Sequence, residues 1–231
     1  MSFPVYNAFV GGGVAIGFLV GDAALRGRPE RSAWPYLCLL ALGCGAVGAV
    51  WFSYYAGVTE SWQRPAFTFL GGAAAALVAL VLCSRVAGLD TLPILDAGAL
   101  GICAGHALGR LGCFFGGCCY GRVINLAPVI DWSFRFPSPL VESGVEVAIL
   151  LYLRRSTCAF AGKPGLLAAR WMILYGIARF GLEFARGDFR GSLPFNSGGM
   201  SPSQCLSLAL VALGAWGHFM IVRGGKALVA S

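Results

Sequence analysis

The sequence has few charged residues: Asp, Glu, Lys and Arg make up 12% of its 231 positions, against about a quarter in a typical soluble domain. Hydrophobic residues supply 58%. This balance excludes a soluble globular domain and indicates a membrane protein. Acidic residues are especially scarce, and the formal net charge of +7 suits an anionic lipid surface or an anionic substrate.

Several other patterns are absent. The alternation of apolar and polar residues typical of transmembrane strands does not occur, which excludes a barrel and leaves a helical bundle. Without an internal repeat or a low-complexity tail, we expect one integral membrane domain over residues 1–231. The lack of an inverted repeat argues against a transporter. Without a short basic leader, we expect the first apolar segment to stay as a helix rather than act as a cleavable signal.

Seven apolar stretches are candidates to cross the roughly 30 Å of hydrocarbon in a bilayer. They cover residues 5–21, 34–57, 66–88, 92–110, 139–153, 165–184 and 201–222. The fifth is short, and the fourth carries four polar or ionisable side chains. The prediction is an all-α membrane protein, a bundle of about seven transmembrane helices.

The basic residues of the loops predict the orientation. With seven spans and the N-terminus outside, the inner side holds nine: Arg26, Arg28, Arg31, Arg85, Arg154, Arg155, Lys163, Arg223 and Lys226. The outer side holds six: Arg64, Arg110, Arg122, Arg135, Arg186 and Arg190. The positive-inside rule therefore favours an outer N-terminus and a cytoplasmic C-terminus. Six outer arginines exceed what topology requires and indicate a site for an anion.

Three of the nine cysteines are clustered. Cys113, Cys118 and Cys119 lie in the segment GRLGCFFGGCCYGR, residues 109–122, at the outer end of a predicted helix, where an oxidising compartment could pair two of them. The spacing lacks the CxxC pairs and histidines of a structural zinc site, so we expect no metal. Single cysteines in the apolar segments are expected to pack as small hydrophobes.

The stretch YGIARFGLEFAR places Tyr175, Arg179, Glu183 and Arg186 at spacings of four, four and three, so they share one helix face. A charge at the centre of a bilayer costs about 2.5–3.5 kcal/mol on insertion scales, and such residues usually face a bundle interior or a wet cavity. We predict that this face points inward. An internal Arg179–Glu183 ion pair that only fixes packing is the structural alternative.

A second polar stripe comprises Asp96, Cys103, His106 and Arg110, and the following helix adds Glu142 and Glu146. His106 taken alone is better explained as a histidine satisfied inside the bundle. The arginines outnumber the carboxylates near them, which points to a bound anion. Because the guanidinium fork matches phosphate, and the commonest phosphate in a membrane is a phospholipid headgroup, we predict an anionic phospholipid as ligand.

Four motifs between residues 65 and 210 resemble, in the same order, those of the prolipoprotein diacylglyceryl transferase family. The family's GR-I/L-GNF-x-N-GE-x-x-GR is matched at Gly109, Arg110, Leu111, Gly112, Phe114, Gly117, Gly121 and Arg122. Its RHPSQLYE is matched at Arg135, Pro137, Ser138, Leu140 and Glu142. Its YGxxRFxxEFxRxxD is matched at Tyr175, Gly176, Arg179, Phe180, Glu183, Phe184 and Arg186. Its S-x-x-Q-x-LS is matched at Ser201, Gln204, Leu206 and Ser207.

The resemblance implies a seven-helix enzyme of the bacterial inner membrane. Such an enzyme transfers diacylglyceryl from phosphatidylglycerol to the cysteine thiol of a prolipoprotein, at a site open to the outer leaflet. The partners expected are phosphatidylglycerol and a prolipoprotein or another thiol acceptor; neither a cofactor nor a nucleic acid is expected.

Four positions depart from the family pattern. Leu70 and Phe136 stand where the family has histidines, Cys113 replaces an asparagine and Cys118 a glutamate. The phosphate-binding arginines remain, whereas several proton-handling groups do not. We therefore predict a divergent transferase; the alternative is a non-catalytic phospholipid-binding accessory protein that retains the arginine pocket.

The expected roles follow the chemistry of thiol alkylation. Arg110 and Arg179 would stabilise the departing phosphate, and His106 or Glu183 would take the proton. Cys113 or Cys118 is either a nucleophile activated by neighbouring arginines or, more simply, a space-filling thiol. Substrate binding is assigned to Arg122, Arg135, Glu142, Tyr175, Arg186 and Gln204.

Overall fold

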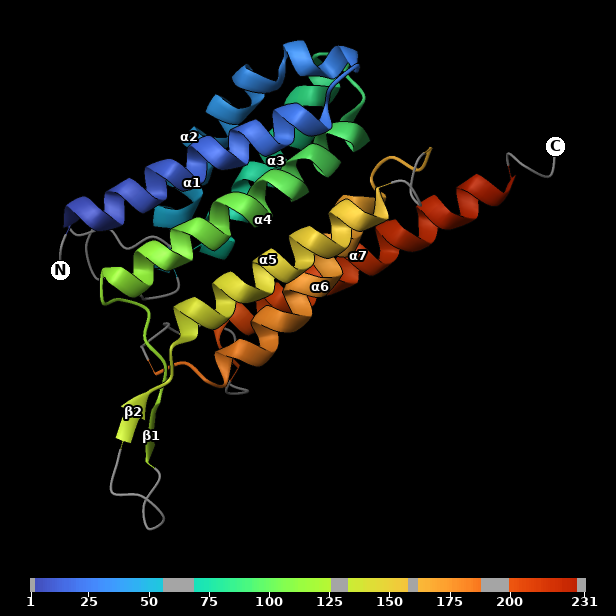
Figure 1. Cartoon of the computed structure of the whole chain (residues 1–231). Coiled ribbons are helices and arrows are strands. Elements are labelled where there is room, and N and C mark those ends of the chain that lie inside the picture. The colour runs from blue at the N-terminus through green and yellow to red at the C-terminus, as the bar shows by residue number, and fades with distance from the viewer. Residues whose placement is uncertain (1–2, 56–68, 126–132, 158–161, 188–199, 228–231) are drawn as a thin grey trace.

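A computed structural model describes residues 3–55, 69–125, 133–157, 162–187 and 200–227. These residues form seven α-helices, a short 3-10 helix and a two-stranded hairpin (Figure 1). The elements are α1 (Phe3–Ala24), η1 (Pro29–Ser32), α2 (Trp34–Tyr55), α3 (Phe69–Val86), α4 (Thr91–Phe115), β1 (Val123–Asn125), β2 (Ser133–Arg135), α5 (Ser138–Ser156), α6 (Leu166–Glu183) and α7 (Pro202–Ala227). Each predicted apolar stretch corresponds to one helix, which confirms the predicted all-α bundle.

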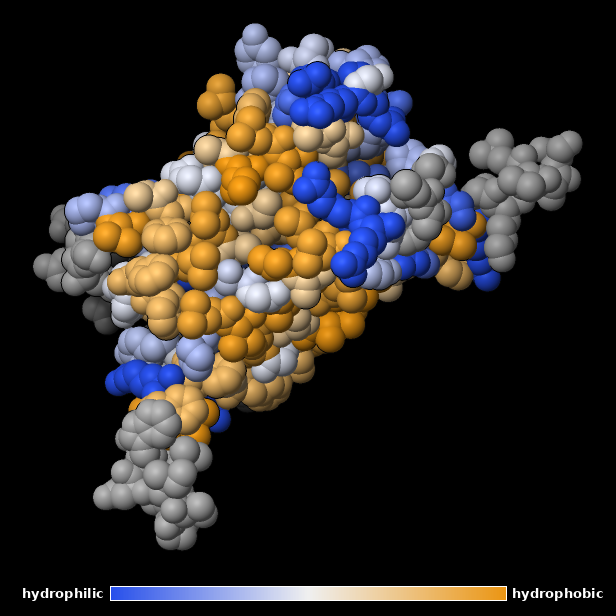
Figure 2. All heavy atoms as spheres, viewed as in Figure 1, coloured by the Kyte–Doolittle hydropathy of each residue, from blue (hydrophilic) through white to orange (hydrophobic). Residues whose placement is uncertain are grey.

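The helices run along a common direction (Figure 1). The pairs α1 and α4, α2 and α3, and α6 and α7 pack against each other most extensively, and α4 also contacts α3, α5 and α6. Four helices, at Pro4–Ala24, Trp34–Tyr55, Thr91–Phe115 and Pro202–Arg223, are long and apolar enough to cross a membrane. Apolar residues cover the middle of the face in Figure 2, with hydrophilic residues toward its upper right and lower left. This is the surface expected of a multi-pass membrane protein.

Glycines allow α1 and α4 to pack with their backbones in contact. A Cβ atom on Gly105 would lie 2.6 Å from the carbonyl oxygen of Gly13, and one on Gly101 would lie 2.6 Å from that of Gly17. In a membrane, helices associate through such close packing of small residues rather than through hydrophobic burial. The glycine pairs therefore fix α4, which carries several of the predicted site residues, against the first helix.

Successive helices run in opposite directions, so the segments that join them lie at two opposite ends of the bundle (Figure 1). Phe9 near the start of α1 stacks on Phe115 at the end of α4, with ring centroids 5.3 Å apart. We call this the site end, because Arg110, Arg122, Arg135 and Arg186 lie there. The basic residues before α2 and in the last turns of α3 and α5 lie at the other end. Arg64 and Arg190, predicted to lie on the outer side, fall outside the described residues.

Asp96, the first member of the predicted polar stripe on α4, has a structural partner. Its carboxylate oxygens accept hydrogen bonds from the backbone N–H groups of Gly165, at 2.7 Å, and Ala168, at 2.9 Å. These are free donors at the beginning of α6, where a carboxylate is favoured by the helix dipole. Asp96 therefore anchors the start of α6 to α4 and lies apart from His106 and Arg110.

Candidate active site

Glu142 on α5 is the centre of a buried ion network at the site end. Its carboxylate accepts from Nη2 of Arg110 at 3.0 Å and from Nη1 of Arg186 at 3.4 Å. Nε of Arg179 lies 3.5 Å from the same carboxylate. All four side chains are buried. One carboxylate thus brings together arginines from α4, from α6 and from the segment after α6, and it fixes their positions.

The buried charges at this end balance in number. They are Arg110, Arg179 and Arg186 against Glu142, Glu146 and Glu183. The expectation that arginines outnumber nearby carboxylates is therefore wrong for the buried network among the described residues. The surplus positive charge of the site end lies in Arg122 and Arg135, which are exposed. Binding of an anion to the buried network would accordingly depend on local donors rather than on net charge alone.

His106 has both ring nitrogens engaged. Nε of Arg110 donates to Nε2 at 3.0 Å, and Nδ1 lies 2.7 Å from Oε1 of Glu146. Because a guanidinium only donates, Nε2 must accept and Nδ1–H must donate to Glu146. The ring of Phe69 also stacks on the imidazole, with centroids 3.6 Å apart. His106 is thus held as the Nδ1–H tautomer and aligns Arg110.

Two buried donors on α6 have no hydrogen-bond partner among the described residues: Nη1 of Arg179 and the hydroxyl of Tyr175. The two residues are 2% and 1% exposed and lie one helical turn apart. The other side of the Arg179 guanidinium is fixed, since Nη2 donates to Glu183 at 2.5 Å. An unsatisfied buried polar group costs about 1–3 kcal/mol. These two donors are therefore suited to an oxyanion that accepts from both.

Gln204 has a structural explanation. Its Oε1 accepts from the backbone N–H of Ser201 at 2.9 Å, and the Ser201 hydroxyl accepts from the N–H of Gln204 at 3.2 Å. This reciprocal pair is a capping box at the start of α7, with Pro202 at the first helical position. The Ser201 hydroxyl also donates to Glu183 at 2.7 Å. Gln204 therefore holds the beginning of α7 and, through Ser201, the orientation of Glu183.

The two exposed arginines of the site end lie at the hairpin, Arg122 directly before β1 and Arg135 as the last residue of β2. The guanidinium of Arg135 lies over the ring of Tyr120, 4.2 Å from its centroid. Nε of Arg122 donates to the carbonyl of Arg186 at 3.3 Å. Gly121 forms an isolated bridge with Arg186, which ties the hairpin to the segment after α6. Among the described contacts, the structure links Arg122 to the buried network through Arg186, whereas Arg135 contacts Tyr120.

The three clustered cysteines come together beyond the end of α4. The sulfur atoms of Cys113, Cys118 and Cys119 all lie within 4.8 Å of one another. The Cys118 thiol donates to the backbone carbonyl of Cys113 at 3.6 Å. Interactions with the Cys113 and Cys118 side chains, and to a smaller extent with the nearby Arg110 and Arg186, lower the pKa of the Cys119 thiol below its ordinary value. Of the described residues, these are the ones able to hold a soft metal ion.

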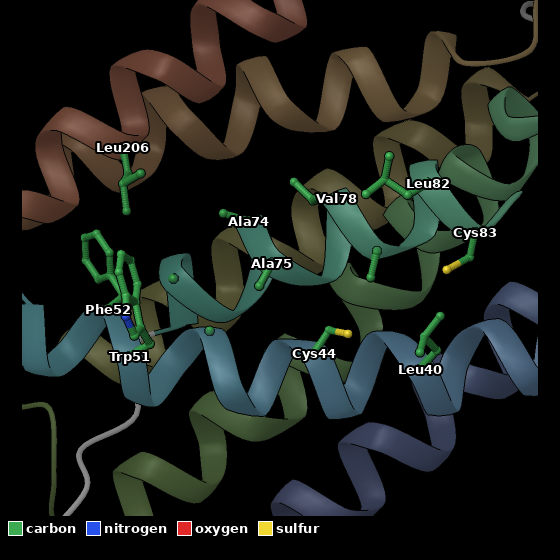
Figure 3. A pocket seen from close by; sticks show the side chains of 13 residues that line it. Leu40, Cys44, Trp51, Phe52, Ala74, Ala75, Val78, Leu82, Cys83 and Leu206 are labelled. Carbon is green, nitrogen blue, oxygen red and sulfur yellow. The ribbon is translucent and has the colours of Figure 1, made fainter. Parts of the chain in front are cut away.

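An apolar hollow of about 560 Å³ lies between α2 and α3 on one side and α7 on the other (Figure 3). Its large lining residues are Leu40, Trp51, Phe52, Val78, Leu82 and Leu206. Its wall on α3 runs from Gly71 to Cys83, about 18 Å at 1.5 Å per residue, close to the ~15 Å of hydrocarbon in one leaflet. Leu206 lies near the start of α7, so one end of the hollow reaches the site end.

Some site residues had weak or no sequence signals. Ser201 was recognisable, because a serine three residues before a glutamine and ahead of an apolar run is a capping-box pattern. Phe69 and Trp171 give no such signal, although Trp171 Nε1 donates to Glu146 at 3.5 Å and Phe69 stacks on His106. Their roles depend on how the helices pack.

Comparison with known proteins gives consistent matches. The family described as prolipoprotein diacylglyceryl transferase matches residues 1–220. Three relatives are named phosphatidylglycerol–prolipoprotein diacylglyceryl transferase. That of Methylobacillus flagellatus is 35% identical over 67% of this chain and 60% of its own length. That of Paramagnetospirillum magneticum is 31% identical over 72% and 65%, and that of Helicobacter hepaticus is 28% identical over 68% and 56%. The chain thus spans less than two thirds of these relatives.

Proposed function

The chain belongs to the prolipoprotein diacylglyceryl transferase family, and from this we propose that it is a divergent membrane transferase. Its donor would be phosphatidylglycerol, bound by the phosphate, and its acceptor the thiol of a prolipoprotein cysteine or of another molecule. The relatives carry both substrates in their names. The reaction forms a carbon–sulfur bond at the glyceryl carbon and breaks the carbon–oxygen bond to phosphate.

The observation that carries this proposal is the pair of unpartnered buried donors, Nη1 of Arg179 and the hydroxyl of Tyr175. A phosphate oxygen placed between them would satisfy both groups. Glu142 holds Arg179 from one side and Glu183 from the other, so the guanidinium is oriented before a ligand binds. Donors fixed in advance stabilise the charge of a departing phosphate without reorganisation. The apolar hollow beside α7 offers a matching surface for acyl chains.

A second candidate is a phospholipid-binding accessory protein without turnover. This candidate is favoured because the two groups proposed to accept the proton of the thiol already accept hydrogen bonds within the protein. Nε2 of His106 already accepts from Arg110, and Glu183 accepts from Arg179 and Ser201. Binding would then persist while the thiol remains unactivated. Both candidates share the phosphate site and differ only in whether a thioether forms.

A transfer assay separates the two candidates. Purified protein is incubated with phosphatidylglycerol carrying a deuterated diacylglyceryl group and with a peptide containing one cysteine. The transferase is expected to add the labelled group to the peptide, detected by mass spectrometry, and to release glycerol phosphate. A peptide with serine in place of cysteine is the control. Bound phosphatidylglycerol with an unmodified cysteine peptide would instead support the accessory protein.

We place the protein in the bacterial inner membrane with the site end facing outward. The support is the positive-inside rule. With this orientation the cytoplasmic side holds nine basic residues, against six on the outer side: Arg26, Arg28, Arg31, Arg85, Arg154, Arg155, Lys163, Arg223 and Lys226. The N-terminus would then be outside and the C-terminus cytoplasmic. A reporter fused after position 231 should be cytoplasmic and a tag near position 190 external. Finding both on the same side of the membrane would refute this topology.

A further inference from the structure

The backbone after α4 explains why two of the three clustered thiols meet. The N–H of Cys118 bonds to the carbonyl of Cys113 at 3.0 Å, and the N–H of Gly117 bonds to that of Phe114 at 3.1 Å. With Gly117 at a φ of 69°, this is the Schellman arrangement, which brings the side chains of Cys113 and Cys118 together. Helix termination alone thus accounts for one pair of sulfur atoms.

Helix termination does not account for the third thiol. Cys119 has a φ of 59° and is the one non-glycine residue with positive φ among the described residues. A side chain in this region is strained and persists only where the surroundings hold it. The consequence of this conformation is that the Cys119 sulfur lies within 4.8 Å of both other sulfurs. A disulfide would use two of the three thiols and leave the third unexplained.

The geometry points to a metal site: we propose that Cys113, Cys118 and Cys119 bind one zinc ion through three thiolates, with the fourth position open. Three sulfurs at the zinc–sulfur distance of about 2.3 Å in a tetrahedral arrangement lie about 3.8 Å apart, within the observed limit. Cys118 and Cys119 are half-buried, so the ion can reach the site.

The open position suits the acceptor thiol, an assignment that rests on the proposed function. A zinc-bound thiol loses its proton outright, which would supply the thiolate that His106 and Glu183 are not free to generate. The acceptor sulfur held at this position would form the bond to the glyceryl carbon as the carbon–oxygen bond breaks, and glycerol phosphate would leave toward Arg179 and Tyr175, the donors proposed to bind the phosphate. Zinc is not consumed, and the proton leaves when the acceptor thiol binds. Cys113 and Cys118 are then ligands rather than nucleophiles.

The test uses the purified full chain, loaded with Zn²⁺, freed of loose metal on a weak chelating resin and analysed for zinc. The wild type is expected to retain about one zinc per chain, as the three ligands imply. Cys119→Gly should lower zinc affinity by more than about 100-fold. The loss of an outer-shell partner already costs about 10- to 100-fold, and the loss of a ligand should cost more. Because glycine tolerates positive φ, the thermal midpoint of this variant should equal or exceed that of the wild type when both proteins are metal-free. Cys38→Ser, which removes a free thiol on α2 outside the lining of the apolar hollow, is the matched control and should retain zinc.

Three further readouts decide the remaining points. Added Zn²⁺ should raise the thermal midpoint of the wild type and leave that of Cys119→Gly unchanged. Equal zinc retention by both proteins, or a disulfide between two of these cysteines in freshly purified protein, would overturn the metal site. With Co²⁺ as a spectroscopic probe, the cysteine peptide should change the absorption of the bound ion and the serine peptide should not. An unchanged spectrum would overturn the acceptor role, and loss of the thioether with zinc still bound would count against the transferase function instead.

Discussion

Glu142→Leu is expected to lower the free energy of unfolding by about 3–5 kcal/mol, the cost of leaving buried partners of an ion pair uncompensated. The carboxylate contacts Arg110, Arg179 and Arg186, and all of them are buried. Without it, three guanidinium groups lie next to one another in an interior that screens their repulsion poorly. The expected result is a markedly lower thermal midpoint of the protein in detergent.

Two variants control this result. Glu142→Gln keeps one oxygen acceptor and should fall between the wild type and the leucine variant. Asp90→Asn removes an acidic group at the start of α4 whose side chain makes no capping hydrogen bond, so its thermal midpoint should stay close to that of the wild type. If Glu142→Leu unfolds at the same temperature as Asp90→Asn, the carboxylate does not hold the arginines together.

The helices were predictable because the bilayer imposes a length on each apolar run. All seven appear, and the principal differences are extensions, of α4 to Phe115 and of α7 to Ala227. The inward face of α6 was predictable for a related reason, since charges in an apolar helix avoid lipid. Tyr175, Arg179 and Glu183 are buried on α6, as predicted. Arg186 is also buried, but α6 ends at Glu183, so the prediction that Arg186 shares the same helix face is wrong.

The pairing of charges was not predictable. Glu142 and Arg186 are 44 positions apart, and their contact depends on how α5 packs beside α6. The same packing pairs His106 with Glu146, 40 positions away, and balances the buried charges. The clustering of the three thiols was not predictable either, because the CxxxxCC spacing does not reveal that Cys119 adopts a left-handed backbone conformation.

Substitutions of Arg179 test whether this residue binds phosphate or only pairs with the neighbouring glutamates. In Arg179→Lys the positive charge beside Glu142 and Glu183 remains, but the guanidinium fork and its unpartnered Nη1 are lost. A hydrogen bond to a charged group contributes about 1.5–3 kcal/mol, so the Kd for phosphatidylglycerol should rise about 10- to 100-fold. If Arg179 were only a partner of the glutamates, the double variant Arg179→Met with Glu183→Leu would keep both stability and lipid affinity.

The most direct measurement is the Kd for phosphatidylglycerol, determined by native mass spectrometry of the wild type, of Arg179→Lys and of Arg154→Lys. Arg154 is exposed at the other end of α5, so Arg154→Lys is the same substitution at a position away from the site. The account predicts tight binding by the wild type and Arg154→Lys, and binding weaker by about 10- to 100-fold in Arg179→Lys, with similar thermal midpoints for all three. Equal affinity in all three proteins would contradict the assignment of the lipid phosphate to Arg179.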